Sequence, residues 1–163
     1  MNNLTTITVA KDYLNFAAAH FTIFSATSRE RLHGHGYQVA AELTAQVGSD
    51  GLSFNYKIVK DLLLEECERL DEYMLLPQFS PHLTIETDGD YYQVKHDADV
   101  MLFLKKDTII LPIRNVTIEE LANMLLERVL EHPKLTDAPL HALEIRVSSG
   151  TQQWAASRWE VTP

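Results

Sequence analysis

Length, composition and charge describe an ordinary globular domain. The chain has 163 residues, 45% of them apolar and 23% charged, with a formal net charge of −9 at pH 7. No basic run is longer than Lys105-Lys106, so nothing offers the phosphate-neutralising surface that nucleic acid requires. We therefore expect no nucleic-acid partner, whereas a small anionic substrate stays open because a pocket can be locally positive in an acidic protein.

The sequence shows no pattern typical of a signal peptide or a membrane-spanning segment. Residues 1–11 lack the basic start and the apolar run of a signal peptide, and the apolar runs are too short for a membrane span. The single cysteine, Cys67, excludes an internal disulfide framework. These features predict a cytoplasmic protein with no membrane contact.

The first half of the chain reads as two extended segments and a helix. Residues 5–24 favour extended structure, and residues 35–46 alternate between apolar and polar side chains with the period of a half-buried strand. A turn is predicted at residues 48–51. A helix is predicted over residues 56–70, with Cys67 on its apolar face, where a buried structural role is expected.

The second half adds an extra β section and a second helix. Thr117 and Glu120 form a capping box that predicts the start of this helix, and Pro133 predicts its end. We interpret residues 1–163 as one domain with an extra β section at about 78–113. The predicted strands of this half cover residues 83–87, 91–95, 100–104, 108–113 and 142–147.

Three histidines form the most informative pattern. His33 and His35 lie two residues apart, so in a strand both imidazoles point to the same face. His20 lies on the preceding extended segment and can fold back opposite that pair. Three neutral imidazoles with a free fourth position are typical of a catalytic zinc site. Because the chain has seven histidines, a chance pattern is the alternative that the residues alone leave open.

The sequence AAAHF at 17–21, followed by RLHGHGY at 31–37, resembles the signature of the 6-pyruvoyltetrahydropterin synthase family. That family includes the 6-carboxytetrahydropterin synthases of queuosine biosynthesis. Four further segments correspond, in order, to motifs of the family, so the resemblance spans nearly the whole chain. These segments are GLSFNY at 51–56, LDE at 70–72, VTIE at 116–119 and IRVSS at 145–149.

The resemblance implies an α+β tunnelling fold, in which an antiparallel sheet carries two helices on one face and subunits oligomerise into a β-barrel. It implies a homohexamer with active sites between subunits. It also implies a zinc cofactor held by His20, His33 and His35, and a pterin substrate such as dihydroneopterin triphosphate. The expected activity is that of a zinc-dependent carbon–oxygen or carbon–carbon lyase in tetrahydropterin biosynthesis.

The position of the family's catalytic cysteine holds Arg29, which stays protonated and cannot replace a thiolate base. The next residue is Glu30, and the segment resembles a subgroup that uses a glutamate instead and makes 6-hydroxymethyldihydropterin. We therefore predict Glu30 as the catalytic base, with a pKa raised by desolvation. The alternative is a solvated charge in an Arg-Glu-Arg turn.

The family position at residue 72 is also altered. Glu72 replaces a histidine, so Asp71 and Glu72 are predicted as a catalytic carboxylate pair that shares a proton, with a simple helix-end pair as the alternative.

Three residues are predicted to bind substrate: Thr117, Glu119 and Ser149. Thr117 could instead serve only as a helix cap. Ser149 stands where the family has a glutamate that clamps the pterin ring, and a hydroxyl binds there more weakly than a carboxylate. These departures leave a second hypothesis, a catalytically inactive or substrate-switched member that binds zinc and a different heterocycle.

Overall fold

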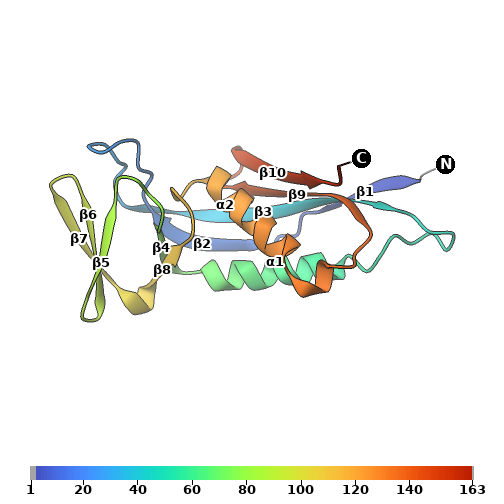
Figure 1. The fold of residues 1–163 in the computed structure, drawn as a ribbon, viewed down its shortest axis with the longest axis horizontal. Helices are drawn as coiled ribbons and strands as arrows, with labels where there is room; N and C mark the ends of the chain where they lie inside the picture. The colour runs from blue at the N-terminus through green and yellow to red at the C-terminus, as the bar shows by residue number, and fades with distance from the viewer. Residues whose placement is uncertain (1–2, 163) are drawn as a thin grey trace.

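A long seven-stranded sheet forms the body of the molecule, and a separate three-stranded sheet lies at one end (Figure 1). The computed structural model describes residues 3–162. Two helices, α1 (Lys57–Leu70) and α2 (Ile118–Leu130), pack on one face of the long sheet. The strands are β1 (Leu4–Val9), β2 (Asn15–His20), β3 (His33–Gln46), β4 (Tyr73–Pro77), β5 (Thr84–Asp88), β6 (Tyr91–His96), β7 (Asp99–Leu104), β8 (Thr108–Leu111), β9 (Leu140–Ser148) and β10 (Trp154–Glu160).

The central strand of the long sheet is β3, which pairs with β1, β2 and β9. Its inward-facing side chains alternate with polar ones, as the sequence predicts, and include the buried Tyr37, Val39, Ala41 and Leu43. These side chains meet the apolar faces of both helices in one continuous core. The expected α+β class, with two helices on one face of the sheet, is therefore confirmed.

The pairing of the long sheet differs from the expectation in one detail. The sheet is mixed rather than wholly antiparallel, because β2 pairs with β4 in parallel and β4 pairs with β8 in parallel.

Two strands, β4 and β10, were not predicted from the sequence. In β4 four of the five residues are buried, so the strand shows no alternation that would reveal it. Most residues of β10 are exposed, and within residues 3–162 its one partner strand is β9.

The stretch predicted as an extra β section contains the three-stranded sheet β5–β6–β7, followed by β8, which joins the long sheet. The small sheet shares a second apolar cluster with the segment that follows β2 and with β4. Within residues 3–162, this cluster contains no residue of α1 or α2. The buried members of this cluster are Phe21, Ile23, Met74, Leu76 and Val94.

The N-terminus of α2 lies where the sequence predicts it. Thr117 is the N-cap, and its side chain accepts a hydrogen bond from the backbone N–H of Glu120. A largely buried ion pair between Arg128 and Glu66, at 2.6 Å, ties α2 to α1. Within residues 3–162, neither helix is long and apolar enough to cross a membrane.

Candidate metal centre and its pocket

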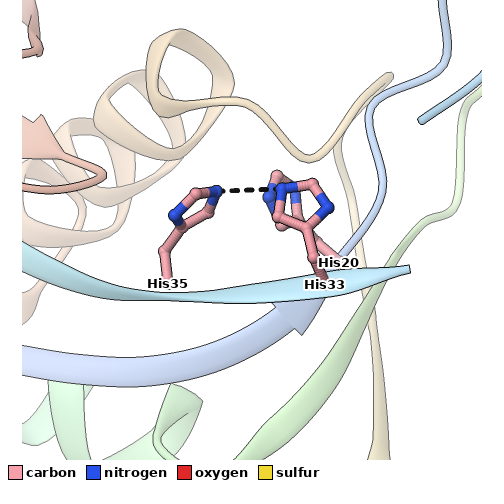
Figure 2. Close-up of side chains that lie close together, drawn as sticks. All are labelled: His20, His33 and His35. Atoms are coloured by element: carbon pink, nitrogen blue, oxygen red, sulfur yellow. Dashed lines mark hydrogen bonds between the residues drawn. The ribbon is translucent and has the colours of Figure 1, made fainter. Parts of the chain in front are cut away.

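The three predicted metal ligands converge on one side of two paired strands (Figure 2). His20 ends β2, and the antiparallel register places it directly opposite His33 at the start of β3. His35 follows two residues later on the same face. The ring centroids lie 4.7 Å apart for His20 and His33, 5.1 Å for His20 and His35, and 4.8 Å for His33 and His35.

The hydrogen bonds of His20 and His33 to backbone carbonyls leave the Nε2 lone pair of each ring available to a metal. Nδ1 of His20 lies 2.8 Å from the carbonyl oxygen of Val116, and Nδ1 of His33 lies 2.7 Å from that of Arg31. A carbonyl only accepts, so each Nδ1 carries the proton and each neutral ring presents a lone pair at Nε2. Among residues 3–162, the buried Nε2 of His20 has no hydrogen-bond partner, and Nε2 of His33 lies 3.0 Å from Nε2 of His35. This donor set fits zinc.

The environment of His20 favours the neutral form that binds a metal. Burial lowers the pKa of His20, and the adjacent His33 and His35 lower it further. The hydrogen bond to the Val116 carbonyl and the charge of Glu30 act in the opposite direction and do not reverse the shift. The imidazole is therefore unprotonated at neutral pH, so a metal does not have to compete with a proton for Nε2.

A steric contact explains why the residue between the two β3 histidines, Gly34, carries no side chain. A Cβ atom at Gly34 would lie 3.1 Å from the backbone oxygen of Ala18 on β2. The absence of a side chain therefore lets the two strands pair closely at the point where His20 faces His33.

A cavity of about 630 Å³ opens over the histidines and contains most of the predicted site. Its walls include Glu30 from the loop after β2, Thr117 and Glu119 from the start of α2, and Ser149 from the end of β9. The structure thus brings these four residues and the three histidines together. It also adds wall residues that the sequence analysis missed, namely Thr22, Tyr37, Ile118, Gln152, Gln153 and Trp154.

The carboxylate of Glu30 lies at the edge of the metal centre. Its Oε2 accepts a hydrogen bond of 3.1 Å from the backbone N–H of Thr22 and lies 3.8 Å from Nε2 of His33. Burial raises the pKa of Glu30, but the hydrogen bonds with Thr22, assisted by electrostatic attraction to His33 and His20 when they are protonated, outweigh it, so the pKa is lowered. The expectation of a raised pKa is therefore wrong. Glu30 is ionised at neutral pH and can accept a proton.

Asp71 and Glu72 lie away from this cavity in the single chain. Asp71 Oδ1 accepts a hydrogen bond of 2.7 Å from the backbone N–H of Ala17, and the backbone N–H of Glu72 donates to the Ala17 carbonyl at 2.7 Å. Glu72 also lines a second surface pocket, whose walls include Gly34, His35 and Gly36 of β3. Both carboxyl residues thus border β2, and their catalytic role stays a prediction.

Cys67 is buried on α1, where the sequence places it. Burial, together with the neighbouring carboxylates, raises the pKa of its thiol to about 12. The thiol is therefore protonated and unreactive at neutral pH.

The mixed sheet with two helices on one face, and a three-histidine pocket beside an ionised carboxylate, define an α+β protein with a candidate metal-dependent active site. The family model of 6-pyruvoyl tetrahydropterin synthase matches residues 8–160. A putative 6-carboxy-5,6,7,8-tetrahydropterin synthase of Methanocaldococcus jannaschii is 27% identical over 89% of this chain and 90% of its own length. The chain belongs to the 6-pyruvoyl tetrahydropterin synthase family, a family of pterin biosynthesis.

Solved structures agree with this assignment. The 6-pyruvoyl tetrahydropterin synthase of Plasmodium vivax superimposes with a TM-score of 0.91 at 28% sequence identity, covering 98% of this chain and 99% of that one. Two variants of the same Plasmodium vivax protein superimpose with a TM-score of 0.88 at 27% identity, covering 98% and 99% of the two chains. In these variants a glutamate named as the catalytic residue of that protein is replaced by alanine or by cysteine.

Proposed function

We propose that this protein is a zinc-dependent enzyme that cleaves a carbon–oxygen or carbon–carbon bond in the side chain of a dihydropterin such as dihydroneopterin triphosphate. The observation that carries the proposal is the buried, unpartnered Nε2 of His20, which converges with His33 and His35 in a cavity that also contains Glu30. Membership of the family supports the pterin substrate. The catalytic glutamate of the Plasmodium vivax protein supports a glutamate as the base.

His20, His33 and His35 would hold the zinc ion through Nε2, with the Val116 and Arg31 carbonyls fixing the rings of His20 and His33. A bound zinc ion would polarise the oxygen substituents of the pterin side chain. Glu30, as the base, would accept the proton of the C2′ hydroxyl as the C1′–C2′ bond breaks, an aldehyde that carries the triphosphate would leave, and the proton would return to C1′ to complete the hydroxymethyl group. The backbone N–H of Thr22 holds the carboxylate beside the histidines and keeps it ionised.

Residues of the cavity wall outside β2 and β3 offer groups for the ring system. Glu119, in the first turn of α2, presents a carboxylate that can accept hydrogen bonds from ring N–H groups. Ser149 offers a single neutral hydroxyl, and Trp154 offers an aromatic surface for stacking. We propose Thr117, Glu119 and Ser149 as the residues that bind the heterocycle.

Product analysis tests this function directly. The zinc-loaded protein is incubated with dihydroneopterin triphosphate, and products are identified by liquid chromatography and mass spectrometry. With Glu30 as the base, we expect 6-hydroxymethyldihydropterin, and prior removal of zinc with a chelator should abolish its formation. Unchanged substrate in the presence of stoichiometric zinc would contradict the proposal.

Ser149 favours a second candidate function, the binding or conversion of a different heterocycle. We predict that Ser149→Glu strengthens the binding of dihydroneopterin about 5- to 30-fold, because a carboxylate gains about 1–2 kcal/mol over a neutral hydroxyl in paired hydrogen bonds. Isothermal titration calorimetry measures the affinity. Gln153→Glu adds the same charge to the same cavity and is the control. Unchanged or weaker binding by Ser149→Glu would contradict the assignment of residue 149 as the position that clamps the ring.

We also propose that the protein is a homohexamer. The long sheet ends in β10 on one side and β8 on the other, and both edge strands leave backbone groups free for pairing with another subunit. In such an assembly, Asp71 and Glu72 would serve the cavity of a neighbouring subunit. Multi-angle light scattering at micromolar concentration should give about six times the chain mass of 18.5 kDa. A mass of one chain would contradict this assembly.

A further inference from the structure

The turn between β6 and β7 holds the segment that carries Glu30. We call residues 22–30 the Glu30 loop. His96, which is only 3% exposed, donates a hydrogen bond of 2.9 Å from Nε2 to the backbone oxygen of Ser25 in this loop. Asp99 faces His96 across the two-residue turn, so both side chains belong to one hairpin end.

Arg29 links the same hairpin to Glu30. Its Nη2 pairs with Oδ2 of Asp99 at 2.6 Å, and its Nη1 donates to the backbone oxygen of Glu30 at 3.0 Å. The guanidinium also lies over the ring of Phe21, 5.3 Å from the centroid. Arg29, at the position of the family's catalytic cysteine, is thereby directed to the small sheet.

The opposite side of the loop is tied to the metal centre. The backbone N–H of Glu30 donates to the Thr22 oxygen at 2.8 Å, and the carboxylate accepts from the Thr22 N–H at 3.1 Å. Oδ1 of Asn115 accepts a hydrogen bond of 3.1 Å from the backbone N–H of Ile23, and Nδ2 of Asn115 donates one of 2.8 Å to the Ile23 carbonyl. Because Asn115 precedes Val116, whose carbonyl orients His20, the loop and a metal ligand share one support.

Apolar packing adds to these polar contacts. Phe21 and Ile23 are buried against Val94 of β6, and Met101 and Phe103 of β7 pack against the same cluster. The buried face of the small sheet is thus directed at the segment that leads to Glu30.

We propose that the β6–β7 turn positions the candidate base: Asp99 and His96, through Arg29 and the Ser25 carbonyl, fix the Glu30 carboxylate beside His33. This inference rests on the proposed function of Glu30 and extends it to positioning residues outside the cavity. The side chain of Arg29 is 19% exposed and that of Asp99 is 62% exposed. Loss of Asp99 therefore leaves a largely buried cation without its charge partner, which favours movement of Arg29 toward solvent and breaks its bond to Glu30.

Steady-state kinetics of Asp99→Ala tests the effect on the reaction. We expect kcat for dihydroneopterin triphosphate to fall about tenfold, with KM and zinc content unchanged, because displacement of the base affects the chemical step. In a Glu30→Gln background, Asp99→Ala should cause no further loss, since the group that it positions is already gone. Losses that multiply in the double variant, or a loss of zinc, would overturn the inference.

The matched control is Glu86→Ala. It removes a carboxylate of the same small sheet that pairs with Lys95 at 2.8 Å and, within residues 3–162, makes no hydrogen bond or ion pair with the Glu30 loop. Its kcat should equal that of wild type. An equal loss of kcat in Glu86→Ala and Asp99→Ala would indicate general destabilisation of the small sheet and would overturn the positioning role.

Amide hydrogen exchange tests the positioning of the Glu30 loop independently of catalytic activity. The backbone N–H groups of Thr22 and Glu30 should exchange about tenfold faster in Asp99→Ala and in His96→Leu than in wild type. His96→Gln keeps an N–H donor and should remain close to wild type. Unchanged exchange in Asp99→Ala and His96→Leu would overturn the inference, whereas faster exchange would support it even if wild type converts no pterin and the proposed function fails.

Discussion

Glu30→Gln is expected to lower kcat toward dihydroneopterin triphosphate by about a hundredfold to ten-thousandfold, equivalent to about 3–5 kcal/mol in the activation barrier. The amide keeps the shape of the carboxylate but cannot accept a proton at neutral pH. The backbone N–H of Thr22 can still donate to the amide oxygen, so the loop should keep its position. Steady-state measurement of product formation gives kcat, and plasma emission spectrometry should show that the zinc content per chain is unchanged.

Glu119→Gln is the control for this experiment, since it makes the same isosteric change in the same cavity. We expect it to raise KM more than it lowers kcat, because Glu119 is proposed to bind the ring rather than to move a proton. Wild-type turnover in Glu30→Gln would remove Glu30 from the mechanism. Attention would then shift to Asp71 and Glu72.

His33→Ala is expected to reduce bound zinc from about one ion per chain to a small fraction, with an affinity loss on the order of a hundredfold or more. The variant removes one of three imidazole donors, and it leaves His35 without the ring whose Nε2 lies 3.0 Å away. Zinc is measured by plasma emission spectrometry after dialysis against metal-free buffer.

His82→Ala serves as the control for zinc content, because His82 is exposed and belongs to no group of metal-ligating side chains found among residues 3–162. It should retain zinc fully. Full zinc retention in His33→Ala as well would contradict the assignment of the ligands.

The convergence of the three histidines follows from the sequence more readily than the chemistry around them. The period of two places His33 and His35 on one face without further information, and a single fold-back brings His20 opposite them. The pKa of Glu30 could not be foreseen in the same way. Its direction depends on a backbone N–H eight residues earlier, which reaches the carboxylate only because of the shape of the loop.

The parts of the fold that were missed lack a local pattern. The fully apolar run of β4 is compatible with a buried helix turn or a strand, and only its parallel partners β2 and β8 make it a strand. The wall residues Gln152, Gln153 and Trp154 were missed because they lie in and beyond an irregular connection after β9, where no periodicity indicates direction. Asp71 and Glu72 were paired with the site by resemblance alone.

Gly34 limits how this sequence can vary. Any side chain at this position would have to push β2 away from β3 by a few tenths of an ångström, because its first carbon would meet the Ala18 oxygen at 3.1 Å. The same displacement would move His20 away from His33, which face each other in the register. We therefore expect a substitution such as Gly34→Ala to disturb the candidate metal site as well as the pairing of β2 with β3, although residue 34 contributes no ligand atom of its own.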